Sequence, residues 1–142
     1  MKVPLAGGTP TTLASTPWVG EDNFTYPGGN AIAVDSTGVY YNVFAFPNTV
    51  MKVPLDGGAP VTLVSSEYEP IQDIAIDGTN LYWATPETLW SMPLVGGAQT
   101  ALASCLSPTS IAVDSTSLYW ANDTTMANGI ITTGGIMKLT PK

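Results

Sequence analysis

One short stretch decides the fold, because the chain repeats it three times: IAVDS at residues 32–36, IAIDG at 74–78 and IAVDS at 111–115. A second motif begins seven residues after the start of each copy. It reads VYY at 39–41, LYW at 81–83 and LYW at 118–120. The recurrence of both motifs in the same order indicates an internal repeat, which constrains the architecture more strongly than any single segment does.

Two further motifs complete the repeat. The third reads VMKVPL at 50–55 and LWSMPL at 89–94, with echoes at 1–5 and 136–139. The fourth reads PVTLV at 60–64, with counterparts at 11–14 and 99–103. Each motif is short, rich in Val, Ile, Thr, Tyr and Trp, and bounded by turn residues, which predicts β-strands. With the four strands named A to D, the chain runs C-D, A-B-C-D, A-B-C-D, A-B-C.

The turn residues support this interpretation. Asp35, Asp77 and Asp114 open the A–B turns, where an aspartate can accept hydrogen bonds from backbone amides two residues further on. Glycine pairs at 7–8, 57–58 and 96–97 are predicted to supply positive φ in the C–D turns. The pairs Tyr82-Trp83 and Tyr119-Trp120 alternate across a strand, so we expect one ring of each pair on either side of its sheet, packed between neighbouring sheets.

Four antiparallel strands every 37–50 residues are typical of β-propeller blades. We therefore predict an all-β fold with about three blades per chain, half of a six-bladed ring, in a single domain spanning 1–142. The predicted parts are a C–D hairpin at 1–14 that belongs to a shared blade, blades at 31–65 and 73–104, and an incomplete blade at 110–140.

A family resemblance rests on three of these segments. MKVPLDGG at 51–58, IAID at 74–77 and LYW at 81–83 resemble the repeats of bacterial extracytoplasmic β-propellers of the TolB-like, YWTD-type and NHL-type six-bladed group. The resemblance implies the propeller fold and leaves function open, because propellers serve in binding, scaffolding and catalysis.

Strand counting predicts an assembly. An arc of three blades leaves two blade faces of about 350 Å² each uncovered, taking usual strand lengths and spacings. Two copies related by a two-fold axis could cover both faces in a closed homodimer. The junction blade would join the A and B strands around Leu118 of one copy to residues 1–14 of the other. One C strand, at 1–5 or 136–139, is then surplus. The alternative is that the chain is part of a longer propeller.

Composition excludes several classes of function. The 142 residues include four lysines, no arginine, no histidine and one cysteine, Cys105, and the net charge is −7. A nucleic-acid surface needs clustered cations, and Ser-His-Asp or Cys-His catalysis needs an imidazole. The apolar runs are too short to span a membrane, and no signal peptide is expected at the N-terminus. Few lysines with many Thr, Ser and Asn residues favour a secreted, periplasmic or cell-surface protein.

Chemistry is expected in the D–A and B–C loops, which differ between repeats and share one rim. Loops held on a rigid scaffold are where binding residues concentrate. Aromatic rings beside carboxylates and amides could stack on a sugar, or the rings could simply cover apolar surface. The candidate ligand-binding residues are Trp18, Glu21, Asp22, Asn23, Phe24, Tyr26, Glu67, Tyr68, Glu69 and Asp123. Phe44 and Phe46 alternate with apolar neighbours and are expected in the core.

A calcium ion held by Asp73, Glu69 or Asp123 is one reading of the acidic rim, and a solvated acidic surface is the other. No catalytic residue and no cofactor other than this calcium ion is predicted. The first hypothesis is therefore a non-enzymatic binding or scaffold module, with a second copy and a carbohydrate or protein ligand as partners and without nucleic-acid binding or membrane insertion. The alternatives are a metal-dependent hydrolase or lyase and a purely structural assembly protein.

Overall fold

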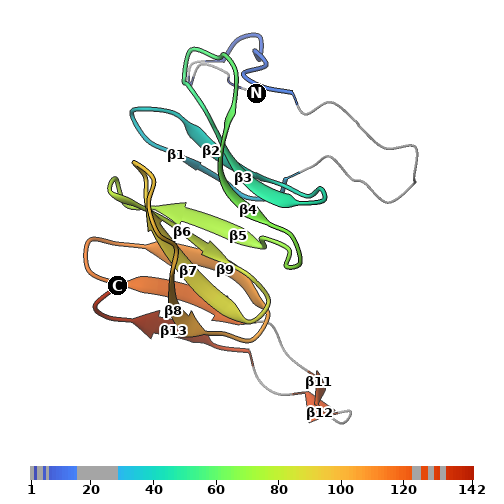
Figure 1. Ribbon diagram of the computed structural model, residues 1–142, viewed down its shortest axis with the longest axis vertical. Helices are drawn as coiled ribbons and strands as arrows, with labels where there is room; N and C mark the ends of the chain where they lie inside the picture. Colours follow the sequence, from blue (N-terminus) through green and yellow to red (C-terminus); the bar gives the residue numbers. More distant parts are fainter. Residues whose placement is uncertain are drawn as a thin grey trace.

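The computed structural model describes residues 2, 5, 7–15, 29–122, 126–127, 130–131 and 134–142, and all regular structure in these ranges is β-strand. Eleven of the strands form three antiparallel sheets that stack one above another, which we call blades 1 to 3 (Figure 1). Blade 1 has the order β1 (Ile32–Val34), β2 (Val39–Val43), β3 (Asn48–Val53) and β4 (Val61–Ser66). The predicted all-β fold with four-stranded antiparallel blades is confirmed.

Blade 2 repeats the order of blade 1 with β5 (Asp73–Ile76), β6 (Asn80–Ala84), β7 (Thr88–Pro93) and β8 (Thr100–Ser104). Blade 3 contains β9 (Pro108–Val113), β10 (Leu118–Asn122) and β13 (Ile136–Leu139). A two-stranded ribbon of β11 (Met126–Ala127) and β12 (Ile130–Ile131) falls in the sequence between β10 and β13. Strand β13 pairs with β10 of the same chain, so the C position of blade 3 is occupied by residues 136–139.

The strand register is the same in all three blades. Ile32 lies opposite Tyr41, Ile74 opposite Trp83, and Ile111 opposite Trp120. Blades 1 and 2 also share an irregularity in the pairing of their outer strands, directly after Val50 and directly after Leu89. Equivalent positions therefore have equivalent backbone surroundings, and their burial can be compared directly.

Each blade has two faces, and side chains alternate between them along a strand. We call the face that looks towards the preceding blade the front face, and the opposite one the back face. On blade 2, Ile74 and Trp83 belong to the front face and pack with Tyr40 and Val50 of blade 1. Tyr82 belongs to the back face, in a cluster with blade 3.

Two apolar cores fill the junctions between blades. The first joins blades 1 and 2, and includes Trp83 stacked on Trp90 with ring centroids 6.2 Å apart. The second joins blades 2 and 3, and includes Leu118 and Trp120. The prediction that Tyr82 and Trp83 pack on opposite sides of their sheet, each between two blades, is confirmed.

A four-residue hydrogen-bond network recurs at every A–B turn. In blade 2, one carboxylate oxygen of Asp77 accepts the amides of Thr79 and Asn80, both at 2.9 Å, and the other accepts the Tyr82 hydroxyl at 2.8 Å. The equivalent bonds of blades 1 and 3 are made by Asp35, Thr37, Gly38 and Tyr40, and by Asp114, Thr116, Ser117 and Tyr119. The predicted role of these aspartates as turn caps is confirmed.

Lysines cover the tyrosines of this network. Tyr40 and Tyr119 lie directly across from Lys52 and Lys138, whose ammonium groups sit 5.1 and 5.4 Å from the ring centroids. In blade 2 the cross-strand partner of the tyrosine is a serine. There Lys142 takes the place of the missing lysine, 5.5 Å from the Tyr82 centroid and 2.6 Å from Asp77 Oδ2. The C-terminal residues thereby bridge blades 2 and 3.

Candidate functional site: the loop edge and the open end faces

The two edges of the blades differ in charge. The turn edge contains the A–B and C–D turns at 35–38, 54–60, 77–79, 94–99 and 114–117. The loop edge contains the connections at 44–47, 67–72, 85–87 and 105–107, because alternate turns of an antiparallel meander lie at opposite edges. Four aspartates and all four lysines of the chain lie at the turn edge: Asp35, Asp56, Asp77, Asp114, Lys2, Lys52, Lys138 and Lys142.

Acidic residues at the loop edge have no lysine among them. Within the described part of the chain this edge carries Glu67, Glu69, Asp73 and Glu87. Charges of opposite sign therefore balance at the turn edge, whereas the described excess of negative charge is confined to the loop edge. Such a surface attracts cations and repels anions.

A hollow of about 340 Å³ lies at the loop edge of blade 1. The β2–β3 connection contributes Phe46 and Pro47 to its lining, and the β4–β5 connection contributes Glu67 and Tyr68. Phe46 is 85% exposed and Tyr68 is 87% exposed. The expectation that Phe46 belongs to the core is therefore wrong. The strand ends at Val43, so the apolar alternation that suggested a buried position continues into a loop.

The predicted ligand-binding residues fall into two groups. Glu67 and Tyr68 line this hollow together, and Glu69 lies one residue further along the same connection. The remaining candidates, Trp18, Glu21, Asp22, Asn23, Phe24, Tyr26 and Asp123, lie outside the described residues. The sequence missed Phe46 and Pro47, and no repeat signal marks them, because the β2–β3 connection differs from the equivalent loops.

Asp73 is engaged at a blade junction. Its Oδ2 accepts the amide of Ile111 in blade 3 at 2.7 Å, and its Oδ1 accepts the amide of Ile74 at 2.9 Å. Across the ranges that the structure describes, no three acidic or cysteine side chains gather closely enough to hold a metal ion. Asp73 therefore links blades 2 and 3 through its hydrogen bond to Ile111. The predicted calcium ligands Asp73 and Glu69 are not brought together with a third ligand among the described residues. Asp123 lies outside the described residues.

The single thiol is shielded. Cys105 is buried, and its Sγ donates to the Thr85 carbonyl oxygen at 3.6 Å. Burial, together with the nearby Glu69 carboxylate, raises the pKa of Cys105 to about 11. The thiolate is the nucleophilic form of cysteine, so this thiol is poorly suited to catalysis at neutral pH.

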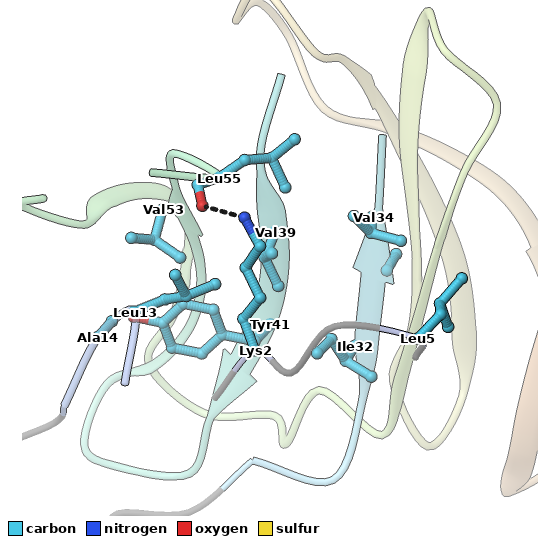
Figure 2. A pocket seen from close by; sticks show the side chains of 11 residues that line it. Lys2, Leu5, Leu13, Ala14, Ile32, Val34, Val39, Tyr41, Val53 and Leu55 are labelled. Atoms are coloured by element: carbon cyan, nitrogen blue, oxygen red, sulfur yellow. Dashed lines mark hydrogen bonds between the residues drawn. The ribbon is translucent and has the colours of Figure 1, made fainter. Parts of the chain in front are cut away.

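The front face of blade 1 is open. A hollow of about 700 Å³ lies against it, lined mostly by apolar side chains that include Ile32, Val34 and Tyr41. Figure 2 shows Leu13 of the N-terminal segment beside Tyr41, whereas Ile32 and Val34 lie across the opening. The Tyr41 hydroxyl is buried and finds no hydrogen-bond partner among the described residues.

Antiparallel blades stacked with their innermost strands side by side define a β-propeller-type fold. No model of a known protein family matches the sequence, and no curated protein matches it either. Among solved structures, the crystal structure of the nidogen/laminin complex contains a similar chain, with a TM-score of 0.63 and 12% identity. The match covers 80% of this chain and 48% of that one, so this chain spans about half the length of the chain it matches. At this identity the likeness shows the fold alone. The bacterial six-bladed group suggested by the sequence motifs stays a prediction.

Proposed function

We propose that this chain is a non-enzymatic binding module in which propeller blades act as a scaffold for a ligand-binding loop edge. The blades complete a ring with a second copy. The acidic loop edge of blade 1 binds cationic side chains of a protein partner. The observation that carries the binding role is the hollow in which exposed Phe46 and Tyr68 meet Glu67.

The chemistry of this hollow suits a lysine or arginine side chain. An aromatic face attracts a cation by about 0.5–1 kcal/mol at an exposed site. The Glu67 carboxylate adds a hydrogen-bond acceptor of opposite charge. Lysines of this chain do not compete, since all four lie at the turn edge. A sugar could also stack on the two rings and donate its hydroxyls to a carboxylate, but only a cationic ligand gains from the net negative charge along this edge.

Fluorescence anisotropy with a labelled peptide containing several arginines tests the proposal. We expect binding that weakens as salt is raised, because charged contacts are screened. Tyr68→Ala and Glu67→Gln should each weaken binding about fivefold, the equivalent of about 1 kcal/mol. The matched control is Val95→Ala, which alters an equally exposed apolar residue at the turn edge.

Two outcomes would contradict this proposal. One is binding that Tyr68→Ala and Glu67→Gln leave unchanged. The other is binding of a neutral oligosaccharide in preference to the arginine peptide, which would assign the hollow to carbohydrate. A peptide of the same length with glutamates in place of arginines serves as the second control.

A secreted or cell-surface location is part of the proposal, and it rests on composition. In the described ranges no helix is long and apolar enough to cross a membrane. The direct test is to fractionate the source cells and to measure how much of the protein is in the medium, the cell envelope and the cytoplasm.

A further inference from the structure

We infer that the hollow on the front face of blade 1 is filled by blade 3 of a second copy, and that residues 11–14 of the first copy form the fourth strand of that blade. This deepens the scaffold part of the proposed function, and its tests do not depend on ligand binding. Four observations support it: two uncovered faces, the backbone of the N-terminal segment and the place where that segment lies.

The front face of blade 1 is exposed where the other two front faces are buried. Ile32, Ile74 and Ile111 occupy the same position of the repeat, each opposite the same position of strand B. Ile32 is 70% exposed, whereas Ile74 is 4% and Ile111 is 7% exposed. In the two buried cases the cover is the back face of the preceding blade. The surface around Ile32 therefore has the chemistry of a blade junction without the neighbouring blade.

The back face of blade 3 shows the complementary pattern. Val50, Leu89 and Ile136 are equivalent residues of strand C, each paired with the same position of strand B. Val50 and Leu89 are fully buried, whereas Ile136 is 78% exposed. Among the described residues, one front face and one back face are therefore uncovered, and these are the two kinds of surface that pack together at both internal junctions.

The N-terminal segment has the backbone of a C–D hairpin. Lys2 pairs with Thr11, as the equivalent Lys52 pairs with Val61 in blade 1. The following glycines also match: φ is 89° and 137° at residues 7–8, 85° and 129° at 57–58, and 91° and 146° at 96–97. The described residues Lys2 and 7–14 therefore match the equivalent positions in the outer half of a complete blade.

This segment lies where the outer strand of a preceding blade belongs. Leu13 lines the hollow, and its equivalents Leu63 and Leu102 pack at the internal junctions. It covers the part of the face near Val53, which is buried, but leaves Ile32 and Val34 on the innermost strand exposed. The uncovered inner part has room for strands A, B and C, and blade 3 consists of those three strands.

A second copy would complete both partial blades, the one that lacks strand D and the one that lacks strands A and B. Blade 3 supplies strands A to C and lacks a fourth strand among the described residues, while residues 11–14 supply a D strand without A or B. Two copies related by a two-fold axis close two such junctions and a ring of six blades. Each junction joins two faces of three strands, about 260 Å² each, so the two junctions cover about 1,040 Å², close to the roughly 1,000 Å² that a specific interface needs.

The structure also indicates which C strand remains in the shared blade. Strand β13 pairs with β10 at four positions, and its chain end is held by Thr140 on Ser117 and by Lys142 on Asp77. The competing strand around Lys2 has one described bridge, to Thr11, and a 3.5 Å contact with the Leu55 carbonyl oxygen. We therefore expect residues 11–14 to leave Lys2 and pair with β13 of the second copy.

Mass in solution is the first test. We expect light scattering on the 142-residue chain to give twice its 14.8 kDa at micromolar concentration. Ile32→Glu and Ile136→Glu should each reduce association at least tenfold while leaving the far-UV circular dichroism unchanged, since both side chains are exposed within one copy. Val95→Glu, an equally exposed change at the turn edge, is the matched control. A monomer, or an open series of larger species, would overturn the closed pair.

Disulfide trapping tests the strand pairing. Val50 lies opposite Val64, and Leu89 lies opposite Ala103. The same register places Ala14 of one copy opposite Ile136 of the other, and directly opposed Cα atoms are about 4.5–5.5 Å apart, within the range of a disulfide. The double variant Ala14→Cys/Ile136→Cys should form a covalent dimer on mild oxidation, and each single variant alone should not.

Two other trapping results would count against the inference. Cross-linking by Lys2→Cys/Tyr119→Cys instead would show that the N-terminal C strand displaces β13, which overturns the strand assignment. A disulfide within one copy of Ala14→Cys/Ile136→Cys would show that a single chain closes on itself. Non-reducing electrophoresis distinguishes both from the expected dimer.

Discussion

Blade 2 and the two end blades are built from the same repeat but differ in what covers them. Blade 2 is buried on both faces, by Tyr40 and Val50 on one side and by Leu118 and Trp120 on the other. Blades 1 and 3 each bury one face and expose the other, at residues whose equivalents in the other blades are buried. The repeat specifies a surface that is complementary to its own neighbour, so each exposed end face has the same residue pattern as a buried junction.

The turn edge and the loop edge of the blades also differ from each other. The turn edge keeps the same Asp-Thr-Tyr network in every blade, and this network closes tight turns. In the described part of the chain, the loop edge has no such repeat and carries four acidic residues without a lysine among them. The repeated residues therefore serve the fold, and the proposed binding site lies in loops that differ from blade to blade.

The largest difference is expected between Ile74→Ala and Ile32→Ala. Removing the buried Ile74 side chain leaves a cavity in the junction core and should lower the free energy of unfolding by about 2–5 kcal/mol. Ile32→Ala should cost less than about 0.5 kcal/mol in dilute protein, because its side chain is already exposed. Urea unfolding followed by tryptophan fluorescence measures both. If copies associate through this face, the cost of Ile32→Ala should grow with protein concentration, and a cost independent of concentration would argue against that junction.

A smaller difference is expected between Asp77→Asn and Asp35→Asn. Asp77 binds Lys142 in addition to the turn amides and Tyr82, and both charged side chains are mostly buried. Loss of the carboxylate removes the charged partner of the Lys142 ammonium, which keeps its hydrogen bond to the Asp114 carbonyl oxygen, and should cost about 1–3 kcal/mol. Asp35 lacks such an ion pair, so Asp35→Asn should cost about 1 kcal/mol. Equal effects in thermal unfolding would mean that the Lys142 contact contributes nothing.

The smallest effect is the response to acid. Burial alone would raise the pKa of Asp77, but hydrogen bonds from Lys142, Thr79, Asn80 and Tyr82 outweigh it and lower the pKa well below the usual value. Hydrogen bonds from Thr116, Tyr119 and Ser117 lower the pKa of Asp114 to about 2. These carboxylates bind fewer protons in the folded chain, so their stabilisation is present above about pH 4 and is lost as the pH falls towards 2.

Unfolding by urea at a series of pH values checks this expectation. Wild-type stability should decline over that interval, and Asp77→Asn should flatten part of the decline, with a smaller change for Asp114→Asn because that side chain is more exposed to solvent. A decline that persists unchanged in the two variants would have to come from other carboxylates. The order of the effects tests whether the middle blade, where Lys142 joins two blades, is the more tightly held region.

Much of the architecture could be predicted from the repeat. The strands, the turn-capping role of Asp35, Asp77 and Asp114, the glycines with positive φ and the packing of Tyr82 and Trp83 all depend on local chemistry or on strict alternation along a strand. The same rules failed at Phe46, where apolar alternation runs past the end of β2 into a loop. A pattern of period two does not reveal where a strand ends.

The sequence alone determined the strand order, the turn chemistry and the shortage of cations, because each follows from residue types at short and repeated spacings. Only the tertiary structure decided that β13 rather than the N-terminal strand pairs with β10, that Asp73 clamps two blades, and that Phe46 and Tyr68 share a hollow with Glu67. These results depend on contacts between segments far apart in the chain. Such contacts are set by competition for the same backbone edges and the same apolar faces, and a local pattern carries no record of which segment wins.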